Sequence, residues 1–167
     1  MQSFSARRIA RVLKILVTAT FFCNLGALPL VPVVVCRTLF EGWPSAWSTG
    51  DGQYALVLIL FLLFCGCCTA VVLWQGRRVL STILRGEPFS PENAVSLRRA
   101  AVCAFCISGA ALIRLLWGIW FYASLRPLAT YNALFVPVFA MAGLLCLVMS
   151  ALFRQAAEIK AENDLTI

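Results

Sequence analysis

Residues 54–74 read YALVLILFLLFCGCCTAVVLW, an apolar run without a single charged side chain. A helix that crosses a bilayer needs about 20 mostly apolar residues, and this run has that length. Because a backbone in lipid has to satisfy its own hydrogen bonds, such a run can only form a membrane helix. The stretch therefore predicts an all-α integral membrane protein.

Three further apolar runs extend over about 11–35, 100–122 and 134–153. Together with 54–74 they take up most of the 167 residues, of which 62% are hydrophobic and 13% are charged. An ordinary soluble domain is about half apolar and about one quarter charged. We therefore expect a single membrane domain over 1–167, built as a four-helix bundle without a separate soluble domain.

The basic residues indicate the orientation of the four helices. Short cytoplasmic segments of membrane proteins retain Lys and Arg. Only Arg37 and Arg126 fall on one side of the predicted bundle, whereas the other side carries Arg7, Arg8, Arg11, Lys14, Arg77, Arg78, Arg85, Arg98, Arg99, Arg154 and Lys160. We expect both termini in the cytoplasm. The net charge of +7 then reflects topology and contact with membrane lipids, and no direct binding of nucleic acid is expected.

The first apolar run is irregular. Asn24 and Gly26 are followed by Pro29 and Pro32, and each proline removes a backbone donor and crowds the preceding turn. This pattern predicts a kink or a break in the first helix. Broken helices line ion or substrate sites in some transporters, but a proline can also simply bend a helix, and both readings stay open here.

The loop between the second and third runs is the most organised polar stretch. Val79, Leu80, Ile83 and Leu84 share one face of a helical continuation that we expect to rest on the bilayer surface or on the bundle. A new helix should begin after Ser90, because Pro91 suits the first helical position. The loop motif comprises Gly86 as the helix end, Glu87, Pro88 and Phe89 in an extended or turned segment, Ser90 as the cap, Glu92 in the first turn, and Asn93, Leu97 and Arg98 on a turn that protrudes from the membrane.

The fourth helix should continue out of the membrane as a helical C-terminal tail. Its last residues are Glu162, Asn163, Asp164, Leu165, Thr166 and Ile167. Acidic side chains followed by apolar ones and a terminal carboxylate suit a shallow basic groove, either on a partner or on the protein's own inner loop. A frayed tail is the alternative.

The loop motif and the C-terminal motif together resemble the signatures of a family of small bacterial four-helix membrane proteins catalogued as domain of unknown function 2975. The order and spacing of the four apolar runs also fit this family. The resemblance implies a prokaryotic inner-membrane protein of unestablished function. Its relatives are often encoded beside a small helix-turn-helix regulator, which suggests a transcription factor as a cytoplasmic partner.

Arg114 is the anomalous residue of the membrane interior. It lies past the middle of the third run, where an isolated charge costs about 3 kcal/mol, and no Asp or Glu occurs in any of the four runs. We expect Arg114 to face the bundle interior and to meet Asn24 and the backbone carbonyls freed near Pro29. It could stabilise the bundle, or it could bind an anionic or polar ligand.

The eight cysteines do not form a recognisable redox or metal motif. All of them lie within or beside apolar runs, the chain has no histidine, and a thiol in an apolar run packs as a small apolar group. We therefore expect no metal, no cofactor and no enzymatic activity. The sequence favours a protein that holds a cytoplasmic partner through its inner loop and tail. The alternative is a small transporter, channel or lipid-binding protein that uses Arg114 and the kinked first helix.

Overall fold

Five α-helices make up the computed structural model, which describes residues 2–39, 50–86, 90–122 and 131–164. The helices are α1 (Gln2–Ala27), α2 (Leu30–Leu39), α3 (Gly50–Leu84), α4 (Pro91–Tyr122) and α5 (Tyr131–Asp164), and these ranges contain no strand. By length and composition, α1, α3, α4 and α5 are able to cross a membrane. Among the described residues, the prediction of an all-α protein with four helices long and apolar enough to cross a membrane is confirmed.

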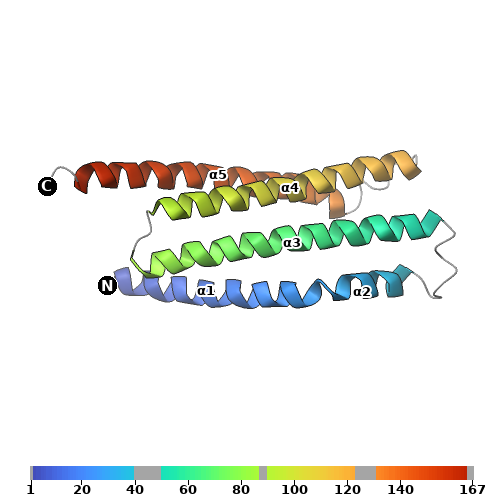
Figure 1. Ribbon diagram of the computed structural model, residues 1–167, viewed down its shortest axis with the longest axis horizontal. Helices are drawn as coiled ribbons and strands as arrows, with labels where there is room; N and C mark the ends of the chain where they lie inside the picture. The colour runs from blue at the N-terminus through green and yellow to red at the C-terminus, as the bar shows by residue number, and fades with distance from the viewer. Residues whose placement is uncertain (1, 40–49, 87–89, 123–130, 165–167) are drawn as a thin grey trace.

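The predicted irregularity of the first span is a break between two helices. The amide of Leu28 donates to the carbonyl of Asn24 at 3.1 Å, which is the last bond of this kind before Pro29 interrupts the ladder. The amide of Val31 then donates to Leu28 at 3.3 Å, and α2 continues in nearly the same direction as α1 (Figure 1). The expected break is therefore confirmed at Leu28 and Pro29.

The helices lie side by side in an open row (Figure 1). Among the described residues, α5 packs only against α4, α4 packs against α3 and α5, and α1 and α2 pack against α3. The first and last helices lie on opposite edges of the row, and both chain termini lie at the same end of the long axis of the molecule, on the left (Figure 1). The expected bundle is thus corrected in one respect, because its first and last helices do not meet to close it.

Pairs of side chains fix the register of neighbouring antiparallel helices. Lys14 of α1 donates to Ser81 of α3 at 3.3 Å, and the rings of Phe21 and Trp74 lie 5.7 Å apart. Between α4 and α5, the hydroxyl of Ser108 donates to the carbonyl of Val136 at 2.9 Å. These contacts fix the register of α1 against α3 and of α4 against α5.

Glycines allow close approach at two of these interfaces. A Cβ atom added at Gly143 of α5 would lie 3.0 Å from the ring of Phe105 on α4, and one added at Gly66 of α3 would lie 2.5 Å from the end of the Leu28 side chain. Small residues at such positions let two membrane helices approach closely. Gly109 does not serve close approach in this way, because nothing lies within 4 Å of a Cβ atom added there.

Candidate functional site

Helix α3 extends beyond the thickness of a membrane. It has 35 residues and is therefore about 52 Å long, whereas the hydrocarbon core of a bilayer is about 30 Å thick. The expected helical continuation over Val79 to Leu84 is the last part of α3, and Leu80 is buried there. This extension forms one part of a surface that we call the polar end. It comprises residues 8–14 of α1, 75–84 of α3 with Arg85 and Gly86 after it, Ser90 with 91–99 of α4, and 150–163 of α5.

The turn after α3 has the predicted geometry. Gly86 has a φ angle of +89°, a left-handed conformation that glycine adopts without strain, and its amide donates to the carbonyl of Ile83 at 3.1 Å. Helix α4 then begins at Pro91, as expected. The motif residues Glu87, Pro88 and Phe89 lie outside the described residues.

The predicted side-chain cap of α4 is not formed. The amide of Asn93 donates to the backbone carbonyl of Ser90 at 3.0 Å, but the buried hydroxyl of Ser90 has no hydrogen-bond partner. Pro91 already occupies the first helical position, where its missing donor costs nothing. The start of α4 is therefore set by the backbone turn and by Pro91, with Glu92 in the first turn as predicted.

Asn93 occupies a different environment from the expected one. It was predicted on a protruding turn, but it is 1% exposed, and the hydroxyl of Thr82 on α3 donates to its Oδ1 atom at 2.7 Å. Leu97 is half-buried and Arg98 is exposed. The first turns of α4 therefore have a buried side and an exposed side. Asn93 joins the start of α4 to the end of α3, while Arg98 is exposed. Hydrophobic periodicity alone could not reveal the buried amide.

A second hydrogen bond ties α5 to this junction. The hydroxyl of Ser150 donates to the carbonyl of Ala94 at 2.7 Å, and both Ala94 and Ser96 are buried. The last turns of α3, the first turns of α4 and the middle of α5 therefore form one packed unit. The basic side chains carried by this unit have a fixed backbone beneath them.

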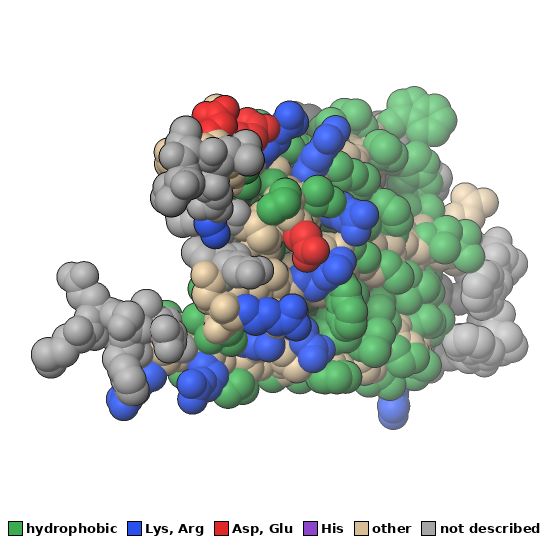
Figure 2. Space-filling view, turned by 60° about the vertical axis from the view of Figure 1, so that its left-hand side comes forward, with side chains coloured by type: hydrophobic (Ala, Val, Ile, Leu, Met, Phe, Trp, Pro, Cys, Tyr) green, Lys and Arg blue, Asp and Glu red, His purple; other side chains and the backbone are tan. Residues whose placement is uncertain are grey.

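Basic side chains gather on the polar end (Figure 2). Arg77 lies with its guanidinium carbon 5.7 Å from the centre of the Trp74 ring. The exposed basic side chains of the polar end are Arg8, Arg11, Arg78, Arg85, Arg98, Arg99, Arg154 and Lys160. Acidic and other polar side chains lie among them, and apolar side chains predominate over the part of the face away from this end (Figure 2). The distribution matches the charge asymmetry expected from the sequence.

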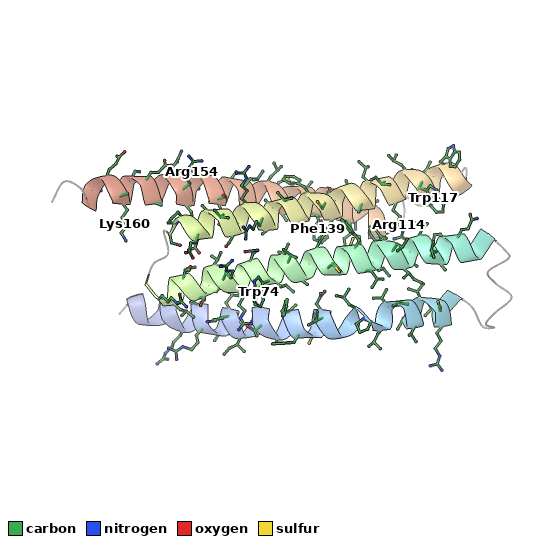
Figure 3. The ribbon with its side chains drawn as sticks, in the orientation of Figure 1. Trp74, Arg114, Trp117, Phe139, Arg154 and Lys160 are labelled. Carbon is green, nitrogen blue, oxygen red and sulfur yellow. The ribbon has the colours of Figure 1, made fainter. Side chains whose placement is uncertain are left out.

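The last turns of α5 project past the row (Figure 1). Ser150 lies beside Ala94, and α4 begins only one turn earlier at Pro91, so α5 has no α4 neighbour beyond about Phe153. The remaining part is about 15 Å long at 1.5 Å per residue. It carries the exposed ion pair Arg154–Glu158 at 2.9 Å, the exposed Ile159 and, further along, Lys160 (Figure 3).

The expected helical tail is present up to Asp164. Glu162 and Asn163 belong to this helix and are exposed. The rest of the C-terminal motif, Leu165, Thr166 and Ile167, lies outside the described residues. The helix brings the acidic part of the motif to the same end of the molecule as the basic side chains (Figure 2).

Arg114 does not meet the first helix. Its Nη2 atom donates to the hydroxyl of Tyr54 at 3.3 Å, and its guanidinium carbon lies 4.8 Å from the centre of the Phe61 ring. Both partners belong to α3, which separates α4 from α1 and α2. The expected contact with Asn24 is wrong, and the Oδ1 atom of Asn24 is buried without a hydrogen-bond partner. The periodicity that places Tyr54 and Phe61 two turns apart on one face of α3 was the signal that sequence reasoning overlooked.

A groove runs between α3 and α4 at Arg114, and we call it the Arg114 groove. Its volume is about 350 Å³. Its apolar walls come from both helices, and its lining consists of Val57, Phe61, Phe64, Ala110, Ile113, Arg114 and Trp117. Arg114 and Trp117 lie in the half of the molecule away from the termini (Figure 3).

The cysteines are free thiols. Cys68 of α3 and Cys103 of α4 lie within hydrogen-bonding range of each other across the helix interface. Within the described ranges, His, Cys, Asp and Glu side chains form no group of three or more that could hold a metal ion. Packing as small apolar groups remains our interpretation of the thiols.

Comparison with protein families provides the assignment. A family model described as "Protein of unknown function (DUF2975)" matches residues 13–167, which is nearly the whole chain. The chain belongs to this family. The resemblance of the loop and tail motifs to DUF2975 is thereby confirmed. Comparisons with curated proteins and with solved structures give no match.

Proposed function

We propose that this DUF2975 protein is a non-enzymatic, multi-pass protein of the bacterial inner membrane that holds a cytoplasmic partner at its polar end. The family resemblance suggests a small helix-turn-helix transcription regulator as that partner. The observation that supports the proposal is the polar end itself. It combines a packed basic surface with a helix that projects beside it (Figures 1 and 2).

Charge asymmetry supports a cytoplasmic position for the polar end. The segments at this end carry most of the basic residues, and short segments rich in Lys and Arg remain on the cytoplasmic side of a membrane. Both termini lie at the same end (Figure 1). In this orientation the polar end is accessible to soluble proteins, and the Arg114 groove lies toward the outer leaflet.

The projecting part of α5 supports helix-to-helix docking. Ala157 lies two turns beyond Ser150 on the same face of α5, so it continues the face that packs against α4. Phe153, Ala156 and Ala157 are half-buried, and Ile159 is 60% exposed. A helix of the partner could lie where α4 has ended and use this small apolar face, as amphipathic helices do when they bind in grooves.

The basic surface supports recognition and orientation of the partner. Arg98 and Arg99 are exposed on the first turns of α4, and Arg85 is exposed just after the end of α3. Exposed charges of this kind increase the rate of encounter and select the partner more than they add to affinity. A partner helix with an apolar face flanked by acidic side chains would fit both the projecting part of α5 and the basic side chains of the polar end.

A crosslinking pull-down from native membranes tests the proposal. The intact chain should capture a small DNA-binding protein, and a chain that lacks Asp164 to Ile167 should lose it without losing membrane insertion. Arg98→Gln should weaken the capture, most strongly at low salt, because added salt screens an exposed charge. The matched control is Arg37→Gln, which removes an exposed arginine of α2 at the opposite end of the molecule.

Three outcomes would contradict the proposal. If the intact chain captures no DNA-binding protein, the partner is wrong. If capture is equal with and without Asp164 to Ile167, the tail is not the docking element, and equal losses in Arg98→Gln and Arg37→Gln would show that general charge, not the polar end, governs retention.

The structure does not favour a transporter built jointly from Arg114 and the kinked first helix. The two features lie on opposite sides of α3, because Arg114 contacts Tyr54 and Phe61 while Leu28 packs against Gly66. A shared ligand site would need them on a common cavity. Arg114 is therefore considered below without the first helix.

A further inference from the structure

Arg114 places a permanent positive charge on the wall of an apolar groove. Its guanidinium lies against the ring of Phe61 and bonds the hydroxyl of Tyr54, so the planar group is held by an aromatic face and by a phenol at once. The groove beside it measures about 350 Å³, within the range of ligand pockets, which is about 300–1,000 Å³. The Arg114 groove therefore offers a ligand a fixed positive charge beside apolar walls.

The backbone of Arg114 lies just below the lipid headgroups, and the bond to Tyr54, at the outer end of the apolar run 54–74, brings the guanidinium toward them. Trp120 of α4 is 80% exposed, as expected for an aromatic anchor at a membrane interface. Arg114 precedes it by less than two turns and lies about 9 Å deeper at 1.5 Å per residue. A lipid that lies along α4 can place its acidic group near Arg114 and its chain further toward the membrane centre.

The groove is open to the side on which lipid lies. Ile113 is 70% exposed and Phe64 is 46% exposed, although both line the groove. In the open row, α4 has only α3 and α5 as neighbours among the described helices, so no other helix covers this face. A molecule dissolved in the bilayer can therefore enter sideways, whereas a water-soluble anion would have to cross the interface first.

We propose that the Arg114 groove binds an anionic phospholipid of the outer leaflet, with the lipid phosphate at Arg114 and one acyl chain along Phe61, Phe64 and Ile113. The guanidinium carries five N–H donors in a planar fork that matches a phosphate. It can hold the phosphate while it keeps its bond to Tyr54. This site is independent of the partner surface at the polar end, and the failure of one proposal leaves the other standing.

Fluorescence quenching by brominated lipids tests the site, because Trp117 lines the groove. The parent protein for the test keeps Trp117 and carries Phe at Trp43, Trp47, Trp74 and Trp120. It is placed in vesicles of phosphatidylcholine with brominated phosphatidylglycerol, or with brominated phosphatidylcholine at the same fraction. We expect about fivefold preferential access of the anionic lipid to Trp117, the effect of one basic side chain near an anionic headgroup.

Variants of the groove separate charge from shape. Arg114→Gln should reduce the preference to about onefold, while Arg114→Lys should keep part of it because the charge stays and the planar fork is lost. Ala110→Phe keeps the cation but fills the groove, so it should also abolish the preference. Arg37→Gln, at the exposed end of α2, is the matched control and should leave the preference unchanged.

Three results would overturn the proposal: equal quenching by both lipids in the parent protein, a preference that survives Arg114→Gln, or a preference lost equally in Arg37→Gln. Helical content measured by circular dichroism identifies a variant that fails to fold. If Arg114→Gln does not fold, Ala110→Phe decides, because a preference that persists in a filled groove contradicts lipid binding there.

Discussion

The interface between α4 and α5 and the interface between α1 and α3 both join antiparallel helices, but they do so with different side chains. On α4 the buried positions are mostly small, with Ala101 and Ala111 fully buried, and Gly143 of α5 receives the ring of Phe105. The α1–α3 pair uses long side chains instead, with Phe21 on Trp74 and Lys14 on Ser81.

This difference shows where the fold is specified most strictly. Small residues let two backbones approach closely, and packing in lipid depends on such approach because the lipid tails provide no hydrophobic driving force between helices. In the most apolar segment of α4, 22% of residues are buried, compared with 6% in that of α1. We therefore expect α4 and its contacts to tolerate change poorly and α1 to tolerate it well.

Enlarging the two packing glycines should produce the largest difference. Gly143→Leu forces a side chain against a rigid ring, and we expect a loss of about 3 kcal/mol in the free energy of unfolding. Gly66→Leu meets the flexible end of Leu28 and should cost less, about 1 kcal/mol. Steric trapping in bicelles measures both values.

Gly109→Ala is the matched control for these two variants. No atom lies within 4 Å of the Cβ atom it adds, so its stability should equal or exceed that of the parent protein. If Gly66→Leu proves as costly as Gly143→Leu, the two interfaces are equally strict and the comparison above is wrong.

Removing the amide of Asn93 should have the next largest effect. Asn93→Leu removes the 2.7 Å contact with the hydroxyl of Thr82, which keeps the carbonyl of Val79 at 2.7 Å as a partner. We therefore expect a loss of about 0.5–1.5 kcal/mol, the net contribution of one hydrogen bond. Thr82→Val removes the other side of the same bond. In a double-mutant cycle the two losses should be coupled, and strictly additive losses would show that the contact contributes nothing.

The hydroxyl bonds between helices should contribute less. Ser150→Ala removes the bond of 2.7 Å to the carbonyl of Ala94 and should cost about 0.6 kcal/mol, the average for such bonds in membranes. Ser81→Ala removes the longer contact of 3.3 Å with Lys14 in the α1–α3 interface and should cost a smaller amount. The same unfolding assay ranks them, and the reverse order would contradict the assignment.

The smallest effect is expected at Arg154 and Glu158. Their side chains are 77% and 59% exposed, and an exposed ion pair one turn apart on a helix contributes about 0.3–0.5 kcal/mol. Glu158→Gln should therefore change stability by no more than this amount, and added salt should remove the difference. A loss above 1 kcal/mol would indicate that the projecting part of α5 contacts other parts of the protein besides α4.

The sequence predicted features that depend on local chemistry. The four spans follow from hydrophobic length, the break follows from Pro29, and the turn after α3 follows from Gly86. Each of these is decided within a few residues of chain. The start of α4 at Pro91 belongs to the same class, although the hydroxyl of Ser90 makes no capping bond.

Features that depend on which helices are neighbours could not be predicted in this way. Arg114 was expected to meet Asn24, but periodicity gives the faces of a helix and not the identity of the helix beside it. Asn93 was expected at the surface for the same reason, because its burial arises only when α3 and α4 are placed together. Sequence reasoning therefore found the charge in the groove but missed its partners Tyr54 and Phe61.

The open row also bears on how the protein is made. Each spanning helix finds its packing surface on the spanning helix that precedes it in the chain, so no helix has to wait for a distant segment before it can dock. Chains dominated by contacts of short sequence separation fold quickly, and synthesis delivers them from the N-terminus onward. The molecule can thus grow sideways in the bilayer, one span at a time, and a ribosome that stalls after α4 would leave behind an ordered unit that lacks only its last member.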